Sequence, residues 1–242
     1  MPLLRNLLVA TALVAASAKD TGTSSDDLCM ADDDNTFHLM WDPYASETGY
    51  FKIKECGDTV MPTIMMKRGV EYTFDQTDKS NWYHAVGFAY FADGAHNEVD
   101  ELEPGITQSG SKCVDDMTCQ APMYFRDGDY VGGDYNNEKV PASGGEDFGL
   151  DVYEPEFFFA SELWEESKYV AKLTLTDDKY DGDLFYFCHI HNKMSARIKQ
   201  VDDDGKVLNE KDEPELGYEY QVPSDFDKKC GTYGTGDYQE SS

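Results

Sequence analysis

One short segment constrains this chain more than any other, because it places four metal-binding side chains at the end of an aromatic run. Residues 182–198 read GDLFYFCHIHNKMSARI. A thiol, two imidazoles and a thioether lie within seven positions of this segment, on Cys188, His189, His191 and Met194. Thiolate and thioether favour Cu(I), whereas imidazole binds both oxidation states of copper. A set of two His, one Cys and a weak axial Met therefore suits a copper ion that cycles between its two states.

The order of these residues predicts a strand, a tight loop and a second strand. The aromatic strand is expected to carry Cys188 to the rim of a sheet, and the loop then brings His191 and Met194 back towards the same ion. A third equatorial ligand has to come from elsewhere in the chain. His84 is the candidate, because it lies inside a half-apolar, strand-like run. The predicted metal ligands are therefore His84, Cys188, His191 and Met194.

One distant His followed by a C-terminal Cys, His and Met loop resembles the cupredoxin family, which includes plastocyanin, azurin and the phytocyanins. The acidic, Gly-containing turn Asp181-Gly182-Asp183 before the Cys188 strand extends the resemblance. The resemblance implies an all-β fold, a Greek-key β-sandwich. It also implies a mononuclear type 1 copper site and one-electron transfer, by a carrier rather than an enzyme. A low-dielectric shell of Phe185, Phe187 and Trp82 is expected around the copper.

Two positions depart from the plastocyanin-like pattern. Only Asn192 and Lys193 separate the second His from the Met, where plastocyanin-like loops place more residues. Plastocyanin-like proteins commonly carry, after the first His, an Asn that steadies the Cys loop by hydrogen bonding. This chain has Ala85 at that position.

Two other functions remain open at this stage. The element His189-Ile190-His191 could belong to a copper oxidase, but such oxidases resemble assemblies of cupredoxin domains that need about eight further imidazoles for a trinuclear cluster. The whole chain has five histidines, so oxidase activity would need a partner. The other alternative is a metal-free, cupredoxin-like extracellular interaction module.

The three remaining histidines are expected to lie outside the copper ligand set. His189 alternates with Cys188 and should point to the opposite face of the strand, as a surface residue or a support to the ligands. His96 closes a polar run and is expected on a solvated loop. His38 alternates with apolar residues and is expected on the polar face of an early strand.

The N-terminal residues have the pattern of a secretory signal peptide over 1–18. Arg5 supplies the positive start, Leu7 to Ala15 the apolar stretch, and Ala16-Ser17-Ala18 a small-residue cleavage site. A disordered linker is expected over 19–28. The cupredoxin-like domain then spans 29–207 with a long acidic insertion at 98–151, and 208–242 form an acidic C-terminal extension. These features predict a secreted protein.

The net charge of −28 limits the partners of the chain. Nucleic acids and anionic membranes require clustered Lys and Arg, so neither is expected as a partner. No later stretch approaches the roughly 18 consecutive apolar residues of a membrane span, so no span is expected. The acidity favours solubility and a basic redox partner protein.

The six cysteines lie beyond the signal, where disulfides persist; they are Cys29, Cys56, Cys113, Cys119, Cys188 and Cys230. Reserving Cys188 for copper leaves an odd number. Cys113 and Cys119 bracket a short loop and are the most favoured local bridge. One thiol among Cys29, Cys56 and Cys230 then stays unpaired, unless Cys188 is itself oxidised and all six pair.

The rest of the chain predicts strands joined by acidic turns, with one short helix. Period-two patterns or apolar runs predict strands at Phe37–Trp41, Tyr50–Ile53, Thr63–Met66, Val70–Phe74, Trp82–Phe91 and Tyr169–Thr176. Residues 197–207 are expected to form a hairpin that turns at Asp203-Asp204-Gly205. A helix is expected over Glu156–Ser167, with the apolar residues of Phe157–Phe159 packed in the core. The Asp-rich turns lack the spacing of a calcium loop and are expected to be solvated.

Overall fold

The computed structural model describes residues 28–43, 49–97, 101–102, 121–131, 149–176 and 180–211. The predicted signal peptide, nearly all of the linker, most of the insertion and the extension beyond residue 211 lie outside the described residues. So do Cys113, Cys119 and Cys230, and with them the predicted Cys113–Cys119 bridge.

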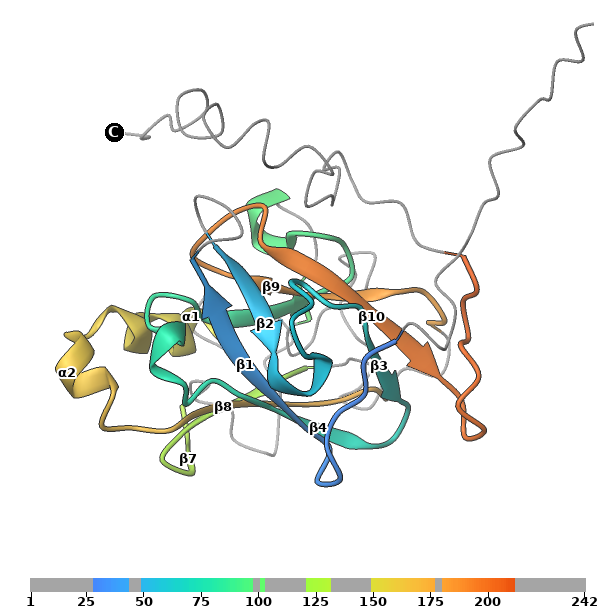
Figure 1. Cartoon of the computed structure of the whole chain (residues 1–242), viewed down its shortest axis with the longest axis horizontal. Coiled ribbons are helices and arrows are strands. Elements are labelled where there is room, and N and C mark those ends of the chain that lie inside the picture. The colour runs from blue at the N-terminus through green and yellow to red at the C-terminus, as the bar shows by residue number, and fades with distance from the viewer. Residues whose placement is uncertain are drawn as a thin grey trace, which may run out of the picture.

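The described residues form a mostly β structure of two mixed sheets with a few short helices (Figure 1). The first sheet has the order β2-β1-β4-β8-β6-β7 and the second β3-β10-β9-β5. The strands of the first sheet are β1 (Thr36–Asp42), β2 (Tyr50–Ile53), β4 (Glu71–Asp75), β6 (Met123–Arg126), β7 (Asp129–Tyr130) and β8 (Tyr169–Thr174). Those of the second sheet are β3 (Ile64–Lys67), β5 (Val86–Ala89), β9 (Leu184–Cys188) and β10 (Ser195–Val201).

Each sheet contains one parallel pair among antiparallel neighbours. Strand β1 runs parallel to β4, and β10 runs parallel to β3. Strand β9 lies between β10 and β5 and is antiparallel to both. Because β9 is central in its sheet, the residues that it carries are held by backbone hydrogen bonds on both sides.

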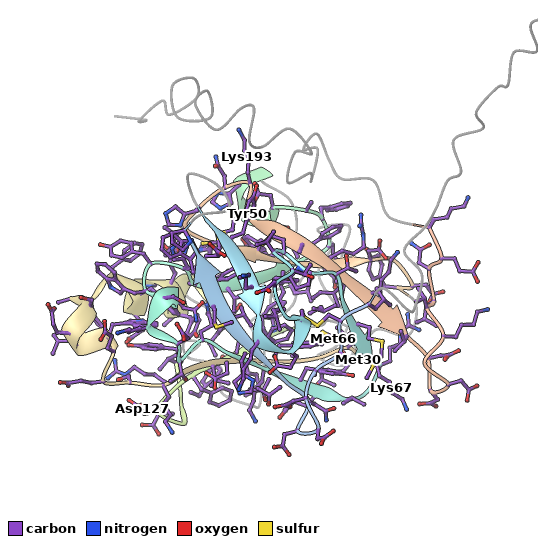
Figure 2. The ribbon with its side chains drawn as sticks, viewed as in Figure 1. Met30, Tyr50, Met66, Lys67, Asp127 and Lys193 are labelled. Carbon is purple, nitrogen blue, oxygen red and sulfur yellow. A yellow bond between two sulfur atoms is a disulfide. The ribbon has the colours of Figure 1, made fainter. Side chains whose placement is uncertain are left out.

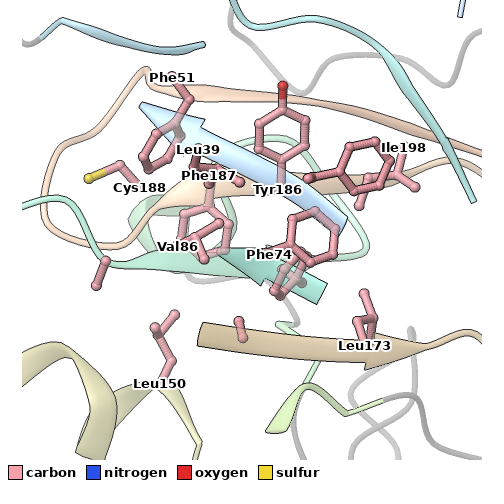
Figure 3. Packing of buried hydrophobic residues seen from close by; sticks show 14 of the residues in the cluster. Leu39, Phe51, Phe74, Val86, Leu150, Leu173, Tyr186, Phe187, Cys188 and Ile198 are labelled. Carbon is pink, nitrogen blue, oxygen red and sulfur yellow. The ribbon is translucent and has the colours of Figure 1, made fainter. Parts of the chain in front are cut away.

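One apolar core joins the two sheets. Strands β1, β2, β4 and β8 alternate buried and half-buried residues, as a sheet with one covered face requires. The ring of Phe74 on β4 lies 4.7 Å from the ring of Phe88 on β5, and Phe51 on β2 lies 6.4 Å from Tyr186 on β9. These ring pairs span the space between the sheets, and the arrangement is consistent with the predicted all-β sandwich (Figure 3).

The predicted strands are largely present, and the predicted insertion contributes more structure than expected. Strands β6 and β7 fall within the 98–151 insertion and extend the first sheet beyond β8. The strand predicted over Trp82–Phe91 begins only at Val86. The chain before it forms the 3₁₀ turn Lys79–Asn81 (η3), so His84 lies in the connection rather than in the strand.

The helix predicted over Glu156–Ser167 is broken into short pieces. The chain forms α1 (Leu150–Tyr153), the 3₁₀ turn Glu154–Phe158 (η5) and α2 (Ser161–Trp164). Phe157 is buried, as expected, but Phe158, Phe159 and Leu163 are exposed. A continuous helix was the wrong prediction, because the backbone leaves helical geometry at Phe159 and Ala160.

Two further findings concern the surroundings of the protein. Among the described residues, Cys29 and Cys56 form a disulfide, whereas Cys188 is a free, buried thiol. The pairing is consistent with an oxidising compartment. No helix in the described part of the chain has the length and apolar character needed to cross a membrane.

Candidate metal centre

Three of the four predicted ligands meet at one end of the sandwich. Sγ of Cys188 lies 3.7 Å from Nδ1 of His84 and 3.5 Å from Nδ1 of His191. The two imidazole rings are 4.7 Å apart between centroids. One ligand atom from each of the three residues falls within 4.8 Å of the others, a group that could hold a metal ion. Residues 104 positions apart in the sequence are thus brought together.

Strand β9 and the loop after it position the thiol. Cys188 is the last residue of β9 and lies opposite Val86 of β5, at the end of the strand in Figure 3. Its backbone N–H donates to the carbonyl of Met194 at 2.8 Å, so the loop closes on itself. Met194 is fully buried and belongs to the same apolar cluster as Cys188. This closed loop carries His191 next to the thiol.

A network of polar contacts positions His84. Its backbone N–H donates to the carbonyl of Asn81 at 2.8 Å, at the end of η3. The buried side chain of Gln76 donates to the carbonyl of His84 at 2.6 Å and accepts from the N–H of Val86 at 3.0 Å. Gln76 therefore spans the connection that presents the imidazole, and fixes its backbone on both sides.

Two rings cover His84, and they are not the expected ones. The ring of Trp41 stacks on the imidazole at 4.4 Å, and that of Phe51 meets it edge-on at 6.5 Å. Alternation along β9 puts Phe185 and Phe187 on the face opposite Cys188, and Trp82 directs its Nε1 to the carbonyl of Phe159. The predicted shell of Phe185, Phe187 and Trp82 is therefore corrected to Trp41 and Phe51.

A buried carboxylate holds the ligand loop. Asp93 is fully buried, and its Oδ2 accepts the N–H of Lys193 at 2.7 Å. The N–H of Asp93 donates to the hydroxyl of Ser195 at 3.0 Å. Lys193 has a φ of 61°, a left-handed conformation that is uncommon for a residue with a side chain. Asp93 thus fixes the turn between His191 and Met194, whose tip carries Lys193 at the surface (Figure 2).

Burial controls the protonation of the three candidate ligands. Burial, together with the neighbouring His191, lowers the pKa of His84 to about 3. Burial also lowers the pKa of His191. Burial raises the pKa of the Cys188 thiol to about 12, although the backbone N–H groups of His191 and Ile190 favour the thiolate. Near neutral pH the site therefore offers two neutral imidazoles and one protonated thiol.

His189 lies beside the site without joining it. Its Nδ1 contacts Glu154, and its Nε2 lies 3.5 Å from Glu101. Although burial opposes the charged form, hydrogen bonds with Glu101 and Glu154 raise the pKa of His189 to about 10. His189, the residue after the end of β9, is thus a largely buried cation between two carboxylates rather than a surface residue.

His96 and Asp183 differ from expectation. His96 is half-buried rather than solvated, and its Nε2 lies 3.1 Å from the carbonyl oxygen of Cys188. Asp183, expected in a solvated turn, is fully buried and pairs with Lys199 at 2.8 Å and Arg197 at 2.8 Å. No local pattern marked either residue, because both contacts depend on how distant strands pack.

The fold and the site together define a β-rich protein with a buried His–Cys–His group suited to a metal ion. Comparison with known proteins adds no relative: no protein-family model, no curated protein and no solved structure matches the chain.

Proposed function

We propose that this protein is a secreted, cupredoxin-like, mononuclear type 1 copper protein that carries single electrons. The observation that carries the proposal is the convergence of one thiol and two imidazoles within 4.8 Å at the end of a central strand. His84, Cys188 and His191 are proposed as the equatorial ligands. Met194, buried at the end of the same loop, is proposed as the weak axial ligand.

The donors fit copper better than a harder cation. A thiolate with two neutral imidazoles suits an ion of borderline or soft character, and a carboxylate is absent from the group. The lowered pKa values of His84 and His191 keep both rings free to bind a metal near neutral pH. The Cys188 proton has to leave on binding, so metal uptake releases a proton.

The surroundings suit electron transfer. Bound copper would supply a one-electron couple at this site. The chain supplies a preformed geometry: β9 is paired on both sides, Asp93 holds the loop, and Trp41 covers His84. A ligand set that stays in place in both oxidation states needs little rearrangement when an electron moves. His191, only half-buried, lies at the edge where an electron can enter.

The experiment is aerobic copper loading followed by metal analysis and a visible absorption spectrum. We expect one copper per chain bound through the Cys188 thiolate, with an intense visible band from that thiolate. Cys188→Ser should abolish the band. Met194→Leu should retain copper and shift the reduction potential, because an axial thioether tunes the ion rather than holding it.

Met30→Leu is the matched control for Met194→Leu. Met30 is 58% exposed, so the same substitution there should leave the spectrum and the potential unchanged. A wild-type chain that takes up no copper after loading would reject the proposal. That result would favour the metal-free interaction module.

The acidity of the chain supports a basic redox partner. An excess of 48 acidic over 20 basic residues should steer a cationic protein, and salt screens this attraction over about 8 Å at physiological ionic strength. Stopped-flow electron transfer with a small cationic redox protein should therefore slow steeply as salt increases. A rate that is indifferent to salt would assign the acidity to solubility alone.

A further inference from the structure

A second cluster of metal-binding side chains lies apart from the Cys188 site. Asp32, His38 and Glu55 each offer one ligand atom within 4.8 Å of the others. Nδ1 of His38 lies 2.7 Å from Oε1 of Glu55 and 4.0 Å from Oδ2 of Asp32. All three residues are half-buried, so the cluster is open to solvent on one side.

The two carboxylates are held so that one oxygen of each is directed at the same imidazole nitrogen. Oδ1 of Asp32 accepts the N–H groups of Asp34 at 3.0 Å and Thr36 at 2.8 Å. Oε2 of Glu55 accepts the N–H of His38 at 2.9 Å. The second oxygen of each carboxylate, Oδ2 of Asp32 and Oε1 of Glu55, is therefore available to bind an ion together with Nδ1 of His38.

The backbone around the cluster is cross-linked. Cys29 lies three positions before Asp32, and Cys56 directly follows Glu55 in the 3₁₀ turn Lys54–Cys56 (η2). The disulfide between these cysteines joins the segment that carries Asp32 to the turn that carries Glu55. His38 itself is fixed in β1, between β2 and β4. The three ligand atoms are therefore positioned before any ion arrives.

The charges of the cluster do not balance. Even a protonated His38 leaves one negative charge uncompensated, and the Glu55 side chain is only 13% exposed. Among the described residues no Lys or Arg pairs with Asp32 or Glu55, while the nearby Lys52 pairs with Asp42 and Asp58. A divalent cation in place of the imidazole proton would remove the imbalance.

We infer that Asp32, His38 and Glu55 form a second metal site, which takes a divalent cation of the zinc class. Two carboxylate oxygens and one imidazole suit Zn²⁺, whereas copper(I) prefers the sulfur ligands of the other site. Ligand atoms in a tetrahedral zinc site lie about 3.3 Å apart, given bonds of about 2 Å. The present separations of 2.7 and 4.0 Å lie on either side of that value. The solvent-facing side leaves the fourth position for water.

The test measures zinc binding to the full chain by equilibrium dialysis in the Cys188→Ser background, which removes the thiol of the first site. His38→Gln and Glu55→Gln are compared with Asp33→Asn, an exposed acid in the same loop. We expect each of the first two variants to bind one Zn²⁺ fewer than the control. If zinc binding is weakened rather than abolished, the affinity for zinc should fall by more than roughly 10–100-fold, which is the usual cost of losing a residue that only supports a metal ligand.

A thermal melt provides a second readout. An ion that binds only the folded chain raises its melting temperature, so zinc should stabilise the Asp33→Asn chain and not the His38→Gln chain. Asp32→Asn keeps the His38–Glu55 contact, so this variant tests the proposed zinc site if His38→Gln fails to fold. It too should weaken zinc binding.

Equal zinc stoichiometry and affinity in all the variants would overturn the inference. The inference would also be overturned if the variants and the Asp33→Asn control all bound zinc only at millimolar concentrations, because any acidic surface binds zinc that weakly. These outcomes are independent of the copper proposal. If the wild-type chain forms no coloured copper site, His38→Gln can still reduce zinc binding by one ion. If the wild-type chain does form the coloured site, His38→Gln can leave zinc binding unchanged.

Discussion

The N–H of Lys193 donates a 2.7 Å hydrogen bond to the carboxylate of Asp93, although the two residues lie 100 positions apart. The bond supports a left-handed residue immediately before Met194. Ala85, which follows His84, has no polar side chain with which to steady the ligand loop. Asp93 provides that support through its hydrogen bonds with Lys193 and Ser195.

Replacing Asp93 should therefore loosen the loop. Asp93→Ala leaves the N–H of Lys193 without its partner, which costs about 1–3 kcal/mol in the free energy of unfolding. Asp93→Asn keeps an oxygen acceptor and should cost less. Urea unfolding of the metal-free chain measures both. In the copper-loaded protein, Asp93→Ala should also alter the visible spectrum, and an unchanged spectrum would show that the loop holds without this contact.

Acid should destabilise the metal-free protein through His84. Its pKa is about 3 in the folded chain and 6.5 ordinarily, so the unfolded chain binds a proton that the folded chain does not. Stability should fall as pH decreases from about 6.5 towards 3, by up to about 1.4 kcal/mol per pH unit for this group. His84→Gln should flatten the curve over this window. Urea unfolding across a pH series, with a chelator present, provides the measurement.

Alkali should destabilise the same metal-free protein through Cys188. Burial raises the pKa of the thiol from 9.0 to about 12, so only the unfolded chain loses its proton readily. Stability should therefore fall as pH rises above about 9. Cys188→Ala lacks the proton and should show a weaker decline. Identical alkaline curves for the two chains would contradict the burial of the thiol.

His189 should contribute stability in the opposite direction to His84. Its raised pKa of about 10 means that the contribution is complete below about pH 6.5 and is lost as pH rises towards 10. At neutral pH, His189→Gln leaves Glu101 and Glu154 facing an uncharged side chain, and should cost about 3–5 kcal/mol. His38→Gln, at a more exposed His–Glu pair, is the control in zinc-free buffer and should cost about 1 kcal/mol. Equal losses of unfolding free energy in His189→Gln and His38→Gln would show that burial does not increase the stability contributed by the contacts of His189 with Glu101 and Glu154.

Removal of the Cys29–Cys56 disulfide should lower stability without removing the proposed copper site. The bridge closes a separation of 27 residues, which corresponds to about 3–4 kcal/mol. The double variant Cys29→Ala, Cys56→Ala should unfold at lower urea and still develop the visible band when folded. A chain that loses the band while folded would link the bridge to the ligand geometry.

Much of the sheet structure could be predicted from the sequence because strands leave a local pattern. Alternation along Val70–Phe74 and Tyr169–Thr176 located β4 and β8. The Cys, His and Met spacing predicted that Cys188 and His191 would meet, and the structure brings His84 to them in a group that could hold a metal ion. Trp41 was predicted only as the end of the strand Phe37–Trp41, and no local pattern indicated that its ring would stack on His84.

The remaining features depend on contacts between distant segments, which leave no local signal. Asp93 reads as an ordinary turn residue, and His96 as the end of a polar run. Asp183 looks like any acid in a turn until Arg197 and Lys199 are brought beside it by the pairing of β9 with β10. Likewise, Asp32 and Glu55 acquire their relation to His38 only through the disulfide and the strand order.

The burial of Cys188 also bears on how the chain matures. Five other cysteines share the chain, and disulfide exchange requires an accessible thiolate. Within the folded sandwich the Cys188 thiol is 0% exposed and keeps its proton, so it is shielded from exchange with its neighbours. In the proposed secreted protein, exchange at Cys188 is therefore a hazard only while the chain is unfolded. Assembly of β9 between β10 and β5 would then be the step that protects a reduced sulfur from oxidation.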